Sequence, residues 1–210
     1  MSPRRELAWY FDFISPFSYL QWPRLQALQA RHAITPVPIV FGAVLEARGH
    51  KGPAEIPHKR EFTYRHALWQ ARRQGTPLRF PPRHPFNPLP ALRLCIAAGA
   101  GAQATTAIFD WIWRDGREAD SAAAIAPLAA RLGVDPGAIA GDAVKAALRA
   151  NTDAALAAGV FGVPTLAIGR DLFWGNDAHD FASAVLDDPA LLDDDEMRRV
   201  LTLPIGIRRD

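Results

Sequence analysis

Two serines near the start of the chain stand where a thiol-binding site could form. In residues 9–20, WYFDFISPFSYL, an apolar run stops at Asp12 and leads into the Ser-Pro-Phe-Ser stretch of residues 15–18. Pro16 predicts that a helix begins here, because the first helical turn tolerates proline. Unpaired N–H groups and the helix dipole favour an anion at such a position. The Ser15 hydroxyl therefore fits two roles: a helix cap, which the local sequence favours, or a hydrogen-bond donor to a bound thiolate.

A second motif, GVFGVPT in residues 159–165, has a proline directly before a predicted strand. If the Val163–Pro164 bond is trans, the proline has only a structural role. If the bond is cis, the Val163 backbone turns outward, and its N–H and C=O can pair with an extended peptide ligand. The local sequence leaves both alternatives open.

A third motif, FWGND in residues 173–177, places the end of a strand next to the start of a helix. Its simplest interpretation is an Asn or Asp cap. The functional interpretation is a binding site in which backbone N–H groups hold a carboxylate and Asp177 holds an ammonium group.

The elements expected around these motifs run in the order β-α-β, a helical block, and then β-β-α. The prolines in the second strand predict a position at the edge of the sheet or near the ends of the strand. Glycine and proline make residues 42–57 loop-like, and proline keeps residues 75–88 irregular. The expected ranges are strands at 6–13, 34–41 and 165–168, a turn at 169–171, a strand ending near Trp174, and helices at 16–32, 57–74 and within 89–158.

This order predicts an α/β protein with a thioredoxin-like fold and a large all-helical insertion. The thioredoxin-like domain is expected in residues 1–45 and 159–210, and the helical insertion in residues 46–158. Leucine, isoleucine and tryptophan recur at helical spacing in the insertion, which favours a packed sub-domain over a linker.

Composition excludes several classes of function. The 210 residues carry a formal charge of only +2, without a basic block interleaved with aromatics, so we expect no nucleic-acid partner. The single cysteine, Cys95, excludes an intrachain disulfide, a CxxC pair and a multi-cysteine metal site, and we expect no metal. Without a long apolar stretch or a signal peptide, the sequence predicts a cytoplasmic protein with no membrane partner.

Together the motifs resemble the thioredoxin-like family of 2-hydroxychromene-2-carboxylate isomerases and kappa-class glutathione transferases. The resemblance covers essentially the whole chain, and the combination is specific although each motif alone is weak. It is carried by FDFISPFSYL, GHKGPAEIPHKREF, LRFPPRHPFN, GVFGVPT and FWGNDAHDF.

The resemblance implies a DsbA-like and kappa-like fold, glutathione as cofactor and a homodimer. Residues 15–18 take the place of a CxxC pair, and Ser15 is the implied catalytic residue that holds the glutathione sulfur as a thiolate. A loop asparagine of the family is replaced here by His50, whose charge would depend on pH and which also fits a solvated loop residue. The implied glutathione-binding residues are Ser15, Phe17, His50, Val163, Pro164, Trp174, Gly175, Asn176 and Asp177.

The expected substrate is a small aromatic 2-oxo acid or a chromene carboxylate. Its carboxylate needs a cation, and Lys59 and Arg83 are the candidates, although each also fits a solvated surface charge. The implied activity is a glutathione-dependent isomerase that converts 2-hydroxychromene-2-carboxylate to trans-o-hydroxybenzylidenepyruvate by reversible thiolate addition. The alternatives are a kappa-like glutathione transferase that releases a conjugate and a non-catalytic glutathione-binding protein. Disulfide exchange is excluded, because serines stand where two sulfurs are required.

Overall fold

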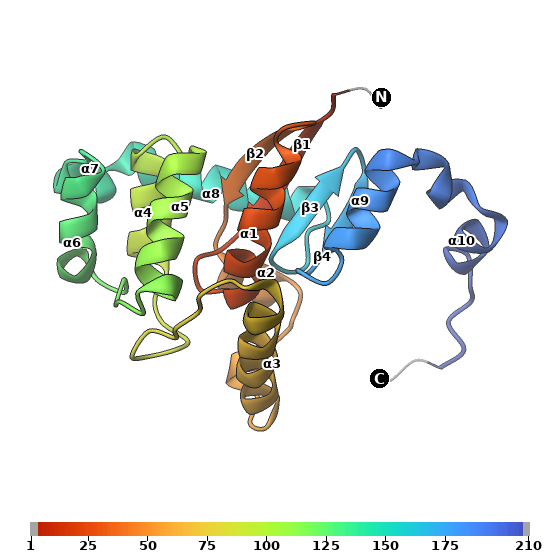
Figure 1. Cartoon of the computed structure of the whole chain (residues 1–210), viewed down its shortest axis with the longest axis horizontal. Helices are drawn as coiled ribbons and strands as arrows, with labels where there is room; N and C mark the ends of the chain where they lie inside the picture. Colours follow the sequence, from red (N-terminus) through yellow and green to blue (C-terminus); the bar gives the residue numbers. More distant parts are fainter. Residues whose placement is uncertain (1–3, 208–210) are drawn as a thin grey trace.

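The structure, a computed structural model, describes residues 4–207, and its centre is a four-stranded mixed sheet (Figure 1). The strand order is β2-β1-β3-β4, in which β1 is parallel to β2 and antiparallel to β3, and β3 is antiparallel to β4. The predicted edge position of the proline-containing strand β2 is confirmed. The strands are β1 (Glu6–Phe11), β2 (Ala33–Pro38), β3 (Thr165–Ile168) and β4 (Asp171–Trp174).

Helices surround this sheet, and the segment between β2 and β3, residues 39–164, makes up most of the chain. The element order β-α-β, helices, β-β-α follows the sequence prediction, and the mixed four-stranded sheet with its helices is an α/β arrangement of the predicted thioredoxin-like kind. The helices are α1 (Pro16–Leu28), α2 (Phe41–Ala47), α3 (Lys59–Gln74), α4 (Leu89–Ala97), α5 (Ala102–Phe109), α6 (Ala122–Arg131), α7 (Pro136–Ile139), α8 (Asp142–Ala157), α9 (His179–Asp187) and α10 (Asp195–Val200), with short helical turns at Pro53–Glu55, Asp110–Arg114 and Pro189–Asp193.

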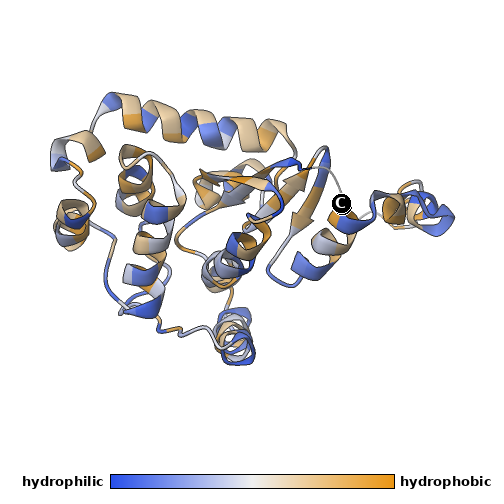
Figure 2. Cartoon of the chain, turned by 45° about the horizontal axis from the view of Figure 1, so that its top comes forward, coloured by the Kyte–Doolittle hydropathy of each residue, from blue (hydrophilic) through white to orange (hydrophobic). Residues whose placement is uncertain are grey.

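The two faces of the sheet bury different clusters. Alternate residues of β1, namely Leu7, Trp9 and Phe11, point into the main core. Trp9 stacks on Phe11 and on Trp22 of α1, with ring centroids 4.5 and 5.1 Å apart. A smaller cluster joins residues of α2 and α8 to the start of β3: Ile39, Val44, Ala155, Val160 and Val163. The helices carry both hydrophobic and hydrophilic residues along their length (Figure 2), as helices with one buried face do.

The loop expected at residues 42–57 is wrong in its first part, which forms α2, and the strand expected to reach residue 41 ends at Pro38. The Phe41 N–H donates to Asp12 Oδ2 at 2.9 Å, and the Val40 N–H donates to Thr152 Oγ1 at 3.1 Å. These bonds lead the backbone away from the sheet, and Val44 then buries its side chain in the smaller cluster. Such tertiary contacts override weak local propensity.

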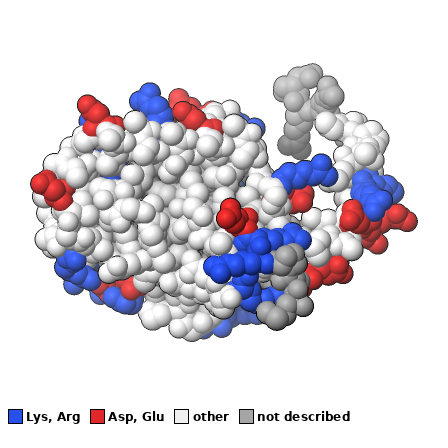
Figure 3. Space-filling view, turned by 90° about the horizontal axis from the view of Figure 1, so that it is seen from above, with Lys and Arg blue, Asp and Glu red and all other residues white. Residues whose placement is uncertain are grey.

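The insertion helices extend from the sheet in two groups. Helix α3 projects beyond the rest of the molecule, and α4 to α7 lie on the side opposite α9 and α10 (Figure 1). The boundaries of residues 46–158 as a separate insertion remain a prediction. Within residues 4–207, no helix combines the length and apolar character needed to cross a bilayer. On the face shown in Figure 3, acidic and basic side chains surround a broad area that carries neither, and no continuous basic stripe crosses it.

Candidate functional site

The three sequence motifs meet at the edge of the sheet that is formed by strand ends, because β1, β3 and β4 alternate in direction. Strand β1 ends at this edge and leads into Ser15. The antiparallel strand β3 starts there after Pro164, and β4 returns to it with Trp174. Tyr10, Thr165 and Trp174 are register partners across the three strands, so the segments that follow or precede them are neighbours.

Ser15 caps α1, as its local sequence predicted. Its Oγ accepts the Ser18 N–H at 3.2 Å, and its own N–H donates to the Asp12 carbonyl at 3.1 Å. Pro16 has no N–H, and the Tyr19 N–H already donates to the Ser15 carbonyl at 3.3 Å. Within residues 4–207, no hydrogen bond uses the Ser15 hydroxyl proton or the Phe17 N–H. The start of α1 therefore keeps two donors for a ligand.

Asp12 is a buried carboxyl group next to this helix start. Its Oδ1 accepts the Ile14 N–H at 3.0 Å, and its Oδ2 accepts the Phe41 N–H at 2.9 Å. The side chain is fully buried, and burial raises the pKa of Asp12 to about 7, although these two backbone hydrogen bonds oppose the shift. Asp12 thus fixes the chain between β1 and Ser15 and titrates near neutral pH.

The loop before β3 and the turn after β4 are bonded to each other. The Val163–Pro164 peptide bond is cis, and the Pro164 carbonyl accepts the Gly175 N–H at 2.8 Å. The Trp174 indole lies directly on Gly162, where an added Cβ would overlap the indole ring. Gly175 has a φ of +100°, a backbone conformation that favours glycine. These contacts place Trp174, about half exposed at 54 %, over the proline loop.

Helix α1 is hydrogen-bonded to the same turn after β4. The buried Gln21 accepts the Trp9 indole N–H at 2.7 Å and donates to the Gly175 carbonyl at 3.0 Å. Arg24 donates to the Asn176 carbonyl at 3.0 Å and pairs with Asp180. The helix that presents Ser15 is therefore bonded to the turn that was predicted to bind the other end of the ligand.

Helix α3 is also hydrogen-bonded to the turn after β4. The Asn176 side-chain N–H donates to Gln70 Oε1 at 2.7 Å, and Gln70 Nε2 lies 3.0 Å from His66 Nε2. His66 in turn contacts Phe17, with ring centroids 5.8 Å apart. Asn176 Oδ1 is buried and has no partner within residues 4–207. A buried amide oxygen without a partner is costly and fits a site that a ligand completes.

The other predicted residues are half-buried or exposed. Phe17 is half-buried, Asp177 is exposed after the turn, and His50 is exposed in the loop after α2. Lys59 is exposed at the start of α3. Arg83 is exposed and pairs with Glu118 at 3.0 Å and with Asp120 at 3.8 Å. The ligand roles assigned to these side chains stay predictions.

The sequence analysis missed three side chains at this edge: Asp12, His84 and Gln70. His84 Nε2 lies 2.8 Å from the carbonyl oxygen of Ile14, the residue before Ser15. An acidic residue that ends an apolar strand was a visible signal for Asp12. No comparable signal marked His84 or Gln70, because their contacts join segments about 70 and 106 residues apart in sequence.

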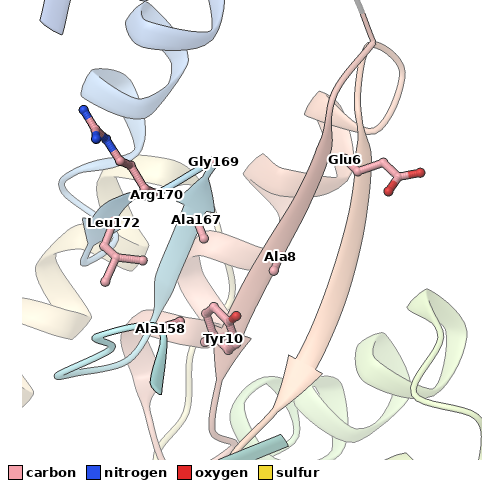
Figure 4. A pocket seen from close by; sticks show the side chains of 8 residues that line it. All are labelled: Glu6, Ala8, Tyr10, Ala158, Ala167, Gly169, Arg170 and Leu172. Carbon is pink, nitrogen blue, oxygen red and sulfur yellow. The ribbon is translucent and has the colours of Figure 1, made fainter. Parts of the chain in front are cut away.

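A cavity of about 420 Å³ lies away from this edge, on the opposite face of the sheet from the main core (Figure 4). It contains none of the predicted site residues. Ala8 and Tyr10 of β1 point toward it, whereas Trp9 between them points into the main core. Its lining residues are Glu6, Ala8, Tyr10, Ala158, Ala167, Gly169, Arg170 and Leu172.

Comparisons with known proteins agree with this geometry. Residues 6–187 match the family model described as a DSBA-like thioredoxin domain. A Pseudomonas putida protein named 2-hydroxychromene-2-carboxylate isomerase is 33% identical over 185 residues, which is 80% of this chain and 87% of the relative. A solved 2-hydroxychromene-2-carboxylate isomerase superposes with a TM-score of 0.76 at 25% identity, over 90% of this chain and 97% of the other. The cytosolic disulfide reductase DsbM from Pseudomonas aeruginosa, solved with GSH, superposes with a TM-score of 0.58 at 19% identity, over 87% and 99% of the two chains, and shows the shared fold.

Proposed function

The chain belongs to the DsbA-like thioredoxin-domain family and, within it, to the 2-hydroxychromene-2-carboxylate isomerases, and on that premise we propose that it is a glutathione-dependent isomerase. The proposed reaction interconverts 2-hydroxychromene-2-carboxylate and trans-o-hydroxybenzylidenepyruvate. The observation that carries the proposal is the start of α1, where the Ser15 hydroxyl and the Phe17 N–H are donors that no described residue uses.

These two donors fit an anionic sulfur. Bound glutathione would supply a thiolate that adds to the conjugated substrate, allows rotation about the former double bond and then leaves unchanged. Ser15 donates its hydroxyl proton toward that negative charge, and the N-terminal end of α1 stabilises it further. Because a free thiol has a pKa of about 8.5, these donors must favour the ionised form at neutral pH.

The rest of the tripeptide has complementary groups at the same edge. The backbone of Val163 pairs with the cysteinyl residue in a strand-like manner. Trp174 and Gly175 cover the γ-glutamyl end, where Asn176 Oδ1, buried and without a partner among residues 4–207, accepts from the ammonium group. Asp177 adds a negative charge for that ammonium, and His50 donates from the loop after α2.

For the substrate carboxylate, the ion pairs favour one of the two candidate cations. Arg83 already pairs with Glu118 and Asp120. Within residues 4–207, Lys59 forms no ion pair, so its charge remains available. We therefore assign the substrate carboxylate to Lys59 first and to Arg83 second. We propose a homodimer by resemblance, and a cytoplasmic location as the sequence predicts.

The function is tested by following 2-hydroxychromene-2-carboxylate with and without glutathione while the free thiol is titrated. The expected result is rapid interconversion that requires glutathione and leaves the thiol concentration unchanged. Accumulation of a glutathione conjugate would instead identify a transferase. Calorimetry that detects no glutathione binding to the folded protein would contradict the proposal.

A further inference from the structure

The peptide unit that joins Ile14 to Ser15 is hydrogen-bonded at both of its polar atoms. Its N–H, which belongs to Ser15, donates to the Asp12 carbonyl at 3.1 Å. Its C=O, which belongs to Ile14, lies 2.8 Å from His84 Nε2. This fixes the N–Cα bond of Ser15 on one side, and on the other side the Tyr19 N–H donates to the Ser15 carbonyl at 3.3 Å, so both peptide groups that flank the Ser15 side chain are held.

The His84 ring is itself held by the helical part of the molecule. Nδ1 lies 2.7 Å from the Tyr64 hydroxyl of α3, and the ring packs edge-on against Trp113 with centroids 5.5 Å apart. Trp113 donates its indole N–H to the Phe13 carbonyl at 2.8 Å. The helical part therefore binds two successive carbonyl groups, those of Phe13 and Ile14, directly before Ser15.

The partners of His84 determine where its protons lie. A backbone carbonyl only accepts, so Nε2 carries the proton that bonds to Ile14. Burial lowers the pKa of His84, the hydrogen bond to Ile14 opposes this shift, and the Arg60 charge adds to it. The Tyr64 hydroxyl donates to the His84 carbonyl oxygen at 2.8 Å, and its oxygen lies 2.7 Å from Nδ1, so it contacts both the backbone and the ring of His84. Tyr64 thus holds the ring in the orientation in which Nε2 faces Ile14.

We propose that His84, oriented by Tyr64, is a positioning residue that holds the Ile14–Ser15 peptide so that the Ser15 hydroxyl and the start of α1 face the glutathione sulfur. The proposal rests on the proposed glutathione-dependent function. It assigns the proline-rich loop a role in thiolate activation, which neither the sequence motifs nor the ion pairs of that loop indicate. Neither His84 nor Tyr64 needs to touch the ligand for this role.

Four variants test the proposal. His84→Leu removes the donor to Ile14, whereas His84→Gln keeps an amide N–H near the position of Nε2. Tyr64→Phe removes only the hydroxyl that orients the ring. His32→Leu is the matched control, because His32 is a buried imidazole that also bonds to a backbone group, the Arg5 N–H at 3.4 Å.

Two readouts separate positioning from general stability. The NMR shift and hydrogen exchange of the Ser15 N–H are measured without ligand. The ultraviolet absorbance of the thiolate then gives the pKa of bound glutathione, together with kcat and KM. In His84→Leu we expect a changed Ser15 signal, a thiol pKa shifted toward that of free glutathione, and kcat lower by about 100-fold with a smaller change in KM. His84→Gln restores most of this loss, Tyr64→Phe lies between, and His32→Leu matches the wild type.

The proposal is overturned if a folded His84→Leu variant keeps the wild-type Ser15 signal and kcat, or if His84→Gln is as impaired as His84→Leu. If His84→Leu does not fold, a wild-type Ser15 signal in Tyr64→Phe overturns it and a shifted one supports it. If wild-type protein binds no glutathione, the proposed function fails, and the ligand-free Ser15 signal still decides whether His84 positions Ser15.

Discussion

At the scale of single residues, the Ser15 hydroxyl serves two purposes at once. Its oxygen accepts the Ser18 N–H and caps α1, while its proton has no acceptor within residues 4–207. The two interpretations that the sequence left open, cap and thiolate donor, are therefore compatible. A hydroxyl can accept from the backbone and donate to a ligand simultaneously.

Replacing Ser15 by alanine separates these purposes. Ser15→Ala should lower kcat by about 100-fold, as loss of one donor to a developing or resident anion does. Its cost in the free energy of unfolding should be about 1 kcal/mol, the usual effect of a lost cap. Ser121 caps α6 with the same bond, Oγ accepting the Ala124 N–H at 3.2 Å, so Ser121→Ala is the matched control and should retain activity. Equal activity in the two variants would contradict the role of Ser15.

Asp12 predicts a pH dependence of stability with a definite sign. Burial raises the pKa of Asp12 in the folded protein from 3.8 to about 7. Between these two pKa values, folded protein binds a proton that the unfolded chain has already released. The resulting contribution of Asp12 to the free energy of unfolding is full below the unfolded pKa and is lost as the pH rises through about 7. The slope is at most about 1.4 kcal/mol per pH unit.

The Asp12→Asn variant removes this titration. Urea unfolding of both proteins is measured across about pH 5 to 8. The free energy of unfolding of the wild type, relative to that of the variant, should fall as the pH rises. A difference in the free energy of unfolding that stays constant over this range would show that Asp12 titrates normally. Some loss of stability in the variant is expected at every pH, because the Asp12 carboxyl group accepts hydrogen bonds from the Ile14 and Phe41 N–H groups.

The sequence identified some site residues and not others for a physical reason. Ser15 and the 174–177 turn lie in local motifs whose helix starts and strand ends can be recognised from neighbouring residues. His84 and Gln70 act through hydrogen bonds to Ile14 and Asn176, which lie far away in sequence. A single sequence carries no local pattern for such a contact.

At the scale of elements, the site depends on how the strand ends are held together. The expected strand at 165–168 and the strand ending at Trp174 are confirmed. They were predictable because short apolar runs on both sides of the turn at residues 169–171 indicate a hairpin. Helix α2 was missed, because it is stabilised by Val44 in the smaller cluster and not by its own sequence. Short elements that depend on tertiary packing are the ones that local patterns miss.

Gly162 tests the packing of the proline loop under Trp174. In Gly162→Ala, the new Cβ would overlap the indole ring, so Trp174 must move away from the loop. We expect glutathione affinity to fall by about tenfold, equivalent to roughly 1.4 kcal/mol, measured by calorimetry. Gly42→Ala in α2 is the control, since nothing lies within 4 Å of its added Cβ. Unchanged affinity in Gly162→Ala would show that Trp174 does not bind the ligand.

At the scale of the whole molecule, the chain combines a thioredoxin-like sheet with helices that reach back to the site. Gln70 of α3, His84 of the proline-rich loop and Trp113 after α5 all bond to the edge of the sheet that carries Ser15. The helical part is thus a structural support for the site as well as a cover for the core. Its helical character was predictable from composition and spacing, whereas these long-range bonds were not.

This chain should show no thiol chemistry of its own, because its single cysteine is buried. Cys95 is fully buried on α4, lies 3.7 Å from Thr105 Oγ1, and burial raises its pKa to about 12. Native protein should therefore not react with a thiol reagent such as DTNB, and one thiol should appear after denaturation. Rapid reaction of the native protein, or insulin reduction by it, would contradict this prediction.

The most direct measurement is a crystal structure of the protein with glutathione. We expect the tripeptide sulfur within hydrogen-bonding distance of Ser15 Oγ and the Phe17 N–H, and the γ-glutamyl end beside Asn176. A sulfur bound away from the start of α1, or no glutathione at saturating concentration, would contradict the assignment of Ser15 as the residue that holds the thiolate.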